Sequence, residues 1–247
     1  MRFYAPIQRR FLERANLIIV ASQQYLDTSE TLRPYRDKCV VVPLGILPDE
    51  FAAPPEEKIE ALRAQYGGGF VLFSGRHRYY KGIEYLVRAA KHIKAPVVIA
   101  GDGPERERCM ALARELDVAI TFPGALTHDE LLVHLHACDV FAFPSIARSE
   151  AYGISMLEAH VAGKPVVATT LGTGVEFVNQ HGVTGLNVPP KDAEALAGAI
   201  NTLIEDPDLR ARLGRAAKLR VETELHAEHI ARVEFELYGK FFSRFRS

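Results

Sequence analysis

The sequence predicts an α/β protein built on a Rossmann-like, doubly wound parallel sheet. Short apolar runs alternate along the chain with segments of helical pattern, and several of the runs end in glycine-containing turns. Alternation of this kind favours a parallel sheet with helices on both faces and right-handed crossovers. The chain has 247 residues, of which 48% are apolar. That length supports one full domain and part of a second.

The first 45 residues carry four predicted elements and a linker. The elements are a helix, a strand, a polar helix and a second strand, in this order: Ile7 to Arg14, Asn16 to Val20, Gln23 to Leu32 and Lys38 to Val42. The segment from Pro43 to Ile46 is interpreted as the linker into the larger part of the chain.

Five further apolar runs are the predicted strands of the larger sheet: Phe70 to Ser74, Ala95 to Ala100, Val118 to Phe122, Asp139 to Phe143 and Gly163 to Ala168. A charged helix is predicted from Glu105 to Leu116, after the second of these strands. The helix after the third carries an apolar stripe: Leu131, Leu132, Leu135 and Cys138. The last predicted element is an amphipathic helix from His226 to Phe242.

Two glutamates, Glu150 and Glu158, flank the start of a predicted helix that opens near Gly153. Glu150 is then on the preceding loop and Glu158 is inside the helix. Backbone amides in a first helical turn lack partners and lie at the positive end of the helix dipole, where a phosphate binds. The amides of Gly153, Ile154 and Ser155 therefore form a candidate anion site, and Glu158 leans back toward it. Taken alone, the two acids also fit a solvated helix face.

Two cations follow the strand that ends at Ser74. Gly75 and Arg76 come directly after it, and Lys81 follows five residues later. Open α/β sheets bind ligands beyond the carboxyl ends of their strands, and an arginine fork with a lysine charge suits a diphosphate. Without the rest of the pattern, they would be two surface cations in a loop.

A sharp turn, Gly101-Asp-Gly-Pro104, follows the next strand. Gly101 and Gly103 suit the turn and Pro104 suits a first helical position, so a structural role explains it as well as a ligand contact does. The third glycine of the dinucleotide fingerprint is missing, and no NAD site is predicted. Residues after several strand ends should meet at one edge of the sheet: Arg76, Lys81, Gly101, Glu150 and Glu176.

The order of these motifs resembles one known family. The motifs are Ser74-Gly-Arg76, Lys81-Gly82, Gly101-Asp-Gly-Pro104, Pro144-Ser145, Glu150-x7-Glu158, Gly163-Lys-Pro165 and Gly172-x3-Glu176. From about residue 38 to 225, the chain is similar to the retaining GT-B glycosyltransferases of family 4. That family has two Rossmann-like domains, and the C-terminal one binds a nucleotide-sugar donor.

The resemblance implies a role for each matched residue. Arg76 and Lys81 would neutralise the donor diphosphate and stabilise the leaving nucleoside diphosphate, with Glu150 as the third catalytic residue. Glu150 would contact and orient the transferred sugar without acting as a nucleophile, and Glu158 would accept hydrogen bonds from the ribose. The implied donor-binding set is Gly75, Gly101, Gly103, Pro104, Gly153, Ile154, Ser155 and Glu158. The family works without a metal, so no metal or other cofactor is expected.

Two positions depart from the family pattern. Thr173 stands where many relatives have a second glycine, and His77 stands where an apolar residue is common. Either departure could shift the choice of sugar. His77 is interpreted as a loop filler, because no orienting carboxylate is visible beside it.

The resemblance also divides the chain. Residues 1–45 resemble a remnant of the N-terminal, acceptor-side domain with its linker, 46–225 the donor domain, and 226–247 a crossover helix. On typical domain sizes, roughly 100 residues of the first domain are expected to be missing. An acceptor-domain polypeptide, or self-association through the exposed N-terminal and C-terminal helices, is therefore an expected kind of partner.

The implied function is transfer of a hexose, with mannose favoured, from a nucleotide-diphosphate sugar to a glycan or lipid-linked sugar acceptor in polysaccharide biosynthesis. Two alternatives stay open: a truncated, inactive fragment that binds the nucleotide sugar, and a partner subunit with a vestigial site. Whether this chain transfers sugar by itself is also open, as are the donor base and the acceptor.

Charge and hydropathy indicate which kinds of partner and which location in the cell to expect. The net charge is −1 and basic residues are not interleaved with aromatic ones, which argues against a nucleic-acid partner. No apolar run approaches the length of a membrane span, so the cytoplasm is the expected location. Residues 1–36 hold six arginines against three acids, which suits either peripheral contact with the inner face of the cell membrane or an ordinary solvated face.

Overall fold

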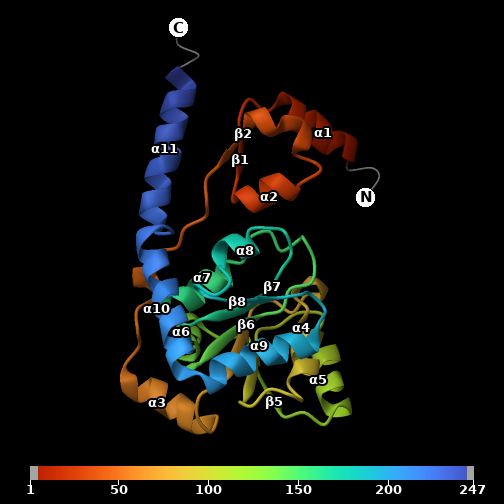
Figure 1. Cartoon of the computed structure of the whole chain (residues 1–247), viewed down its shortest axis with the longest axis vertical. Coiled ribbons are helices and arrows are strands. Elements are labelled where there is room, and N and C mark those ends of the chain that lie inside the picture. The colour runs from red at the N-terminus through yellow and green to blue at the C-terminus, as the bar shows by residue number, and fades with distance from the viewer. Residues whose placement is uncertain (1–4, 244–247) are drawn as a thin grey trace.

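The computed structural model describes residues 5–243 as a small N-terminal unit and a larger α/β domain (Figure 1). Residues 1–4 of the predicted N-terminal remnant and residues 244–247 of the predicted crossover segment lie outside the described range. Arg2, one of the six arginines counted near the N-terminus, is among them.

The larger domain is built on a six-stranded sheet in which all neighbouring strands are parallel. Its strands are β3 (Val71–Ser74), β4 (Val97–Ala100), β5 (Ile120–Gly124), β6 (Val140–Phe143), β7 (Val166–Thr169) and β8 (Gly185–Val188). Their order across the sheet is β5-β4-β3-β6-β7-β8. Counted from β3, this is the 3-2-1-4-5-6 order of the doubly wound Rossmann fold, which confirms the predicted fold class.

Strand β8 is the one strand of this sheet that the apolar pattern did not predict. It contains Gly185 and Asn187, so it has no continuous apolar run. A Cβ on Gly185 would lie 2.0 Å from the carbonyl oxygen of Val166 on β7, so only glycine fits this close approach. The buried Asn179 amide donates to the Leu186 carbonyl at 3.2 Å and to the Asn187 side-chain oxygen at 2.7 Å. Polar contacts therefore hold this edge strand in place.

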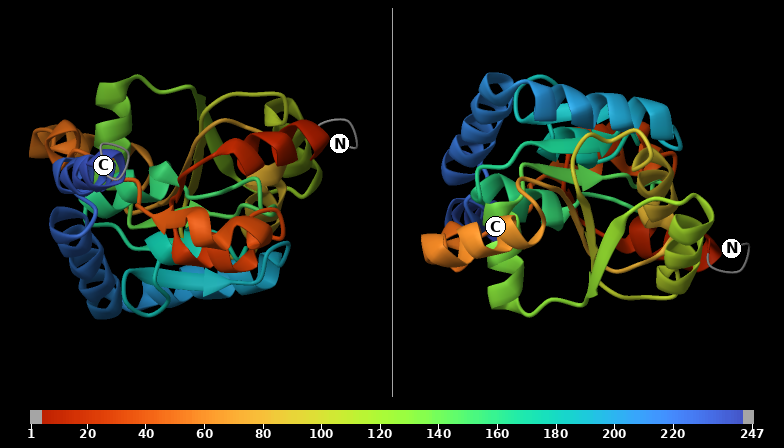
Figure 2. Two further views of the ribbon diagram at one scale, coloured as in Figure 1. Left: turned by 90° about the horizontal axis from the view of Figure 1, so that it is seen from above. Right: turned by 90° about the horizontal axis from the view of Figure 1, so that it is seen from below.

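Helices cover both faces of the sheet because side chains alternate along each strand. In β3, Leu72 joins one apolar cluster, while Val71 and Phe73 join the other. The Leu72 face carries α3 (Glu56–Gln65), α6 (His128–Ala137), α7 (Ile154–Val161) and α8 (Val175–Val178). The opposite face carries α4 (Ile83–Ala89), α5 (Arg106–Glu115) and α9 (Ala193–Glu205). Figure 2 shows α9 and α3 on opposite sides of the strands.

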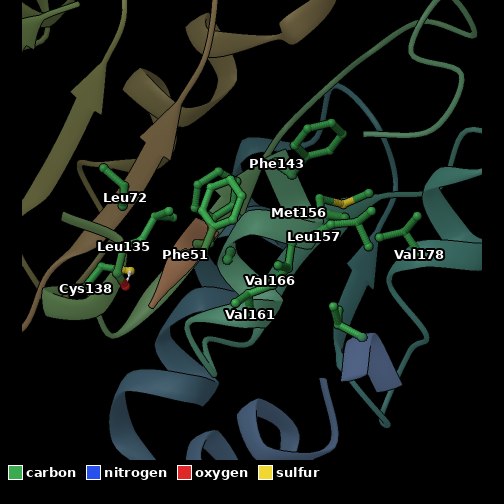
Figure 3. Close-up of a cluster of buried hydrophobic side chains, with 14 of the residues drawn as sticks. Phe51, Leu72, Leu135, Cys138, Phe143, Met156, Leu157, Val161, Val166 and Val178 are labelled. Carbon is green, nitrogen blue, oxygen red and sulfur yellow. Dashed lines mark hydrogen bonds between the residues drawn. The ribbon is translucent and has the colours of Figure 1, made fainter. Parts of the chain in front are cut away.

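Packing beneath the candidate site is apolar. Figure 3 shows Phe143, at the end of β6, close to Met156 and Leu157 of α7, and all three side chains are fully buried. The start of α7 is therefore fixed by its own core against the strand that precedes it.

The N-terminal unit has a separate small core. It comprises α1 (Ala5–Arg14), β1 (Ile18–Val20), α2 (Gln23–Thr28), the 3-10 segment η1 (Arg33–Lys38) and β2 (Cys39–Val41). β1 and β2 pair in parallel. The helix expected to reach Leu32 ends at Thr28, because Ser29 is extended and Leu32 turns into the core. That core is Leu12, Val20, Leu26 and Leu32.

The linker pairs with the C-terminal end of the domain. The Ile46 amide donates to the Leu225 carbonyl at 3.0 Å, and the Ala227 amide donates to the Ile46 carbonyl at 2.9 Å. These contacts lie between α10 (Pro207–Thr223) and α11 (Ala227–Ser243). α11 projects away from the domain (Figure 1) and exposes apolar side chains that include Phe235 and Phe242. Within residues 5–243, no helix is both long and apolar enough to cross a membrane.

Candidate functional site

The candidate site lies where the strand order reverses, between β3 and β6. In doubly wound sheets, ligands bind in the crevice at this point, beyond the carboxyl ends of the strands. The loop after β3 carries Arg76 and Lys81, and the loop after β6 carries Glu150. Residues about 70 positions apart in the sequence therefore reach one edge of the sheet.

Lys81 and Glu150 form a nearly buried ion pair. The Lys81 Nζ lies 2.6 Å from Glu150 Oε2, and the two side chains are 14% and 10% exposed. The Ser145 hydroxyl donates to the same carboxylate oxygen at 3.0 Å. The Thr173 hydroxyl donates to the Glu150 carbonyl at 2.9 Å, so both ends of this residue are held.

Lys81 is aimed at the crevice by a short turn, η3 (Tyr79–Lys81), that ends at a left-handed glycine. Gly82 has φ +62°, and a Cβ there would lie 2.1 Å from the Pro144 carbonyl oxygen. The Lys81 ammonium lies 4.9 Å from the ring centre of Phe143, a geometry that favours a cation. The turn after β3 therefore packs directly on the turn after β6.

A pocket of about 600 Å³ opens beside Arg76 at the ends of β3, β4 and β5. Its lining is Ser74, Gly75, Arg76, Gly101, Asp102, Gly103, Ala125, Leu126 and Leu131. The Arg76 side chain is exposed, and within residues 5–243 it has no hydrogen-bond or ion-pair partner. Gly101 has φ +116°, and a Cβ there would lie 1.9 Å from the Gly75 carbonyl oxygen. Glycine thus lets the two turns close together under the pocket.

His77 fills the space beneath these turns. It is fully buried, and its Nε2 lies 3.3 Å from the Ala100 carbonyl oxygen. Burial lowers the pKa of His77 below its usual value, with the backbone contact to Ala100 acting in the opposite direction. The side chain is therefore a packed part of the turn, in agreement with its interpretation as a filler.

The helix α7 begins as the spacing of the two glutamates predicted. Gly153 is its N-cap with φ +92°, and Ile154 is its first residue. In the described part of the chain, the amides of Gly153, Ile154 and Ser155 have no acceptor. The half-buried Glu158 lies one turn further on.

Burial raises the pKa of the Glu158 carboxyl above its usual value, while the charges of His128 and Lys81 lower it. The Glu158 carboxylate has no hydrogen-bond or ion-pair partner within residues 5–243. A partly desolvated carboxylate without a partner has acceptor capacity left for a ligand.

Of the predicted residues, Gly75, Arg76, Gly101 and Gly103 line the pocket, whereas Lys81, Glu150 and the residues of α7 lie outside its lining. Pro104 is exposed at the start of the segment before α5 and does not line the pocket. Three contributors were not in the predicted set of catalytic and donor-binding residues: Ser145, Thr173 and Asp102. The first two hold Glu150, and their polar type after a strand end was the available signal. Within residues 5–243, no cluster of three or more His, Cys, Asp and Glu side chains is arranged to hold a metal ion.

The sequence of this chain matches a known protein family. The model of the family described as Glycosyl transferases group 1 matches residues 55–220, which include every residue of the candidate site. The chain belongs to this family. Group 1 membership covers the whole of the six-stranded sheet, from β3 to β8.

Sequence similarity to two named relatives covers more of the chain than the family model does. The chain is 35% identical over 239 residues to the O-antigen chain mannosyltransferase C of Escherichia coli, which covers 96% of this chain and 64% of that protein. It is 38% identical over 221 residues to the D-rhamnosyltransferase WbpZ of Pseudomonas aeruginosa, covering 89% of this chain and 58% of that one. The chain thus spans less than two thirds of the length of either relative.

Solved structures show the same fold over nearly the whole chain. Sucrose-phosphate synthase from Thermosynechococcus elongatus superposes with a TM-score of 0.86 at 29% identity, covering 99% of this chain and 63% of its own. Anabaena Alr3699/HepE in complex with UDP superposes with a TM-score of 0.82 at 25% identity, covering 97% and 67%. The group 1 chain therefore has the Rossmann-like fold of GT-B proteins.

Proposed function

We propose that this chain is the donor-binding part of a retaining glycosyltransferase of family 4. It transfers a hexose, with mannose favoured, from a nucleotide-diphosphate sugar to a glycan or lipid-linked sugar acceptor. The observation that carries the proposal is the meeting of Lys81 and Glu150 at the switch point of the sheet, on the edge where Arg76 lines a pocket.

In this proposal, Arg76 and Lys81 bind the diphosphate. Their charges act most strongly in the transition state, because the bridging oxygen gains negative charge as the bond to the sugar breaks. The unpaired amides at the start of α7 supply further donors to the phosphates. The free Arg76 side chain supports this role, since it has no other partner within residues 5–243.

The two glutamates take different parts of the donor. Glu158 accepts hydrogen bonds from the ribose hydroxyls, and its unpaired, half-buried carboxylate supports that assignment. Glu150 orients the transferred sugar. Its contacts with Lys81 and Ser145 favour an orienting residue over a free nucleophile. The acceptor proton then goes to the leaving phosphate in a front-face displacement.

The relatives support the donor class. Their names specify mannosyl and rhamnosyl transfer, and Alr3699/HepE was solved with UDP. We favour GDP-mannose as the donor and expect no metal requirement. A cytoplasmic location, with peripheral contact at the inner face of the membrane, fits a lipid-linked acceptor.

Titration calorimetry of the chain with GDP, UDP and ADP in the presence of EDTA tests the proposal. We expect clear binding of one nucleotide, GDP first. Absence of binding to all three would overturn the assignment of a working donor site. Binding of GDP without any transfer from GDP-mannose would make this chain a donor-binding module.

The ribose assignment has its own test. Glu158→Ala should weaken GDP by roughly 10- to 100-fold, because hydrogen bonds to a charged group contribute about 1.5–3 kcal/mol. Inorganic pyrophosphate, which has no ribose, should bind Glu158→Ala and the parent chain equally. Glu222→Ala, an exposed acid on α10, is the matched control. Equal losses for GDP and pyrophosphate would show that the ribose assignment is wrong.

A further inference from the structure

In the loop between β6 and α7, the side chains of Arg148, Glu150 and Tyr152 contact three different parts of the chain. Glu150 points to Lys81 in the candidate site. Arg148 and Tyr152, two residues to either side, both contact the part of the chain that precedes the larger domain. The residue proposed to touch the sugar is therefore flanked by two long-range anchors.

Tyr152 is the anchor on the linker. Its side chain is buried, and its hydroxyl donates to the Leu44 carbonyl at 2.9 Å. Two residues further along, Ile46 exchanges backbone hydrogen bonds with Leu225 and Ala227. The Tyr152 hydroxyl thus ties the loop to a linker that is itself fixed to the α10–α11 junction.

Arg148 is the anchor on the N-terminal unit. Its Nη2 donates to the Thr28 hydroxyl on α2 at 2.8 Å, and its Nη1 donates to the Gly172 carbonyl at 2.8 Å. The Thr28 hydroxyl also donates to Gly172. The guanidinium lies 5.8 Å from the ring centre of Tyr25. One arginine therefore joins α2 to the loop after β7.

The loop after β7 closes the connection to Glu150. The Gly174 amide donates to the Ala151 carbonyl at 2.8 Å, and the Thr173 hydroxyl donates to the Glu150 carbonyl at 2.9 Å. A displacement of α2 is then transmitted to the backbone of Glu150 and of the next residue, Ala151.

We propose that Arg148 and Tyr152 are positioning residues that set the place of Glu150 according to where the N-terminal unit and the linker lie. The effect of these residues on the sugar rests on the proposed function of Glu150. The hydrogen bonds that hold the loop exist independently of any ligand.

Two conservative variants remove one anchor each. Tyr152→Phe deletes the hydroxyl on Leu44 and keeps the ring. Tyr238→Phe is its control, because that hydroxyl donates to Glu234 on exposed α11. Thr28→Val deletes the hydroxyl that accepts from Arg148 Nη2 and donates to Gly172. Thr202→Val on α9 is the control that loses only a bond within its own helix.

The first measurement needs no ligand. Hydrogen exchange followed by mass spectrometry reports the amides of Ile146 and Glu150, which donate to Tyr80 and Ala147. We expect both Tyr152→Phe and Thr28→Val to speed exchange in residues 146–152 by roughly 2- to 10-fold, the equivalent of one hydrogen bond, while the controls do not. Unchanged exchange in both variants would overturn the proposal.

The second measurement compares the binding of GDP-mannose and GDP, and it distinguishes a change in the position of Glu150 from a general loss of order in the site. Tyr152→Phe should weaken GDP-mannose by roughly 2- to 10-fold more than GDP, because Glu150 contacts the sugar directly and the diphosphate only through Lys81. Equal weakening of both ligands would contradict a positioning role. If the parent chain binds neither ligand, the proposed function fails, and the exchange data still decide whether the N-terminal part holds the loop.

Discussion

Lys81 and Glu150 satisfy each other's charge in a nearly dry setting, at 2.6 Å. The desolvation of two ions offsets most of their attraction, so such a pair adds little net stability, whereas removing one partner typically costs about 3–5 kcal/mol. Substitution of either residue therefore confounds loss of function with loss of stability. Glu158 and Tyr152 are better sites for testing the ligand, because neither takes part in an ion pair within residues 5–243.

His160 is also buried, but unlike Lys81 and Glu150 it has no oppositely charged partner within residues 5–243. It is 1% exposed in α7, and its Nε2 has no hydrogen-bond partner in the described part of the chain. The pKa of His160 is lowered to about 3, first by burial and then by the charge of Arg220, while a hydrogen bond with Asn179 acts in the opposite direction. The folded chain therefore keeps this ring neutral.

We predict that His160 makes the fold acid-sensitive. Its pKa is about 3 in the folded chain and about 6.5 in the unfolded chain, so the unfolded state takes up the proton first as the pH falls. The contribution to stability is complete above pH ~6.5 and decreases as the pH falls toward ~3, by about 2 kcal/mol between pH ~7 and ~5. Urea unfolding of His160→Gln should show a flatter dependence on pH than the parent. His229→Gln, on exposed α11, should keep the parent slope; equal slopes for all three chains would contradict the prediction.

The turns after the strands depend on glycine at the points where two loops touch. Gly82 and Gly163 both have left-handed backbones, with φ +62° and +69°. Around Gly163 a Cβ would have open space, whereas at Gly82 it would meet the Pro144 carbonyl oxygen at 2.1 Å. Substituting both glycines therefore distinguishes the cost of a left-handed backbone from the cost of a clash with Pro144.

Gly82→Ala should therefore be more harmful than Gly163→Ala. Both changes place a Cβ in a left-handed residue, at a cost of about 1–2 kcal/mol. Only Gly82→Ala also forces the Lys81 turn away from Pro144, which adds about 1–3 kcal/mol as overpacking does. Urea unfolding gives the stabilities, and calorimetry should show weaker GDP binding for Gly82→Ala alone. Equal stabilities would mean that the turn moves without resistance.

Within residues 5–243, two of the contacts between the N-terminal unit and the larger domain lie at α2 and at the linker. α2 contacts the loop after β7 through Thr28, and the linker is held by Leu225 and Ala227. At the second place the packing is tight, because a Cβ on Gly45 would lie 2.7 Å from the Cα of Ala227. The placement of the smaller unit therefore depends on contacts between segments about 180 residues apart.

Gly45→Ala should loosen this junction. Overpacking costs about 1–3 kcal/mol, so amide exchange at Ile46 and Ala227 should rise by roughly 5- to 100-fold. Hydrogen exchange with mass spectrometry measures it. Gly198→Ala, in α9 with no atom near its added Cβ, is the control and should leave that region unchanged. Unaltered exchange in Gly45→Ala would show that the linker does not need the close approach.

Local patterns in the sequence predicted the strands β3 to β7 and the loop-to-helix change between Glu150 and Glu158. They did so because apolar runs, glycine turns and helix starts depend on near neighbours. The same patterns missed β8, whose stability comes from Asn179 and from close contact with Val166. They also made the second helix too long, since the packing of Leu32 into the small core ends it earlier.

The sequence by itself determined the fold class and the chemical character of the site: two cations, two carboxylates and a helix start, each placed after a strand. Only the tertiary structure decided which of these groups touch. The pairing of Lys81 with Glu150, the burial of His77 and the anchoring of Tyr152 on Leu44 all join distant segments. Such contacts are set by the packing of whole elements against each other, and no local periodicity records that packing.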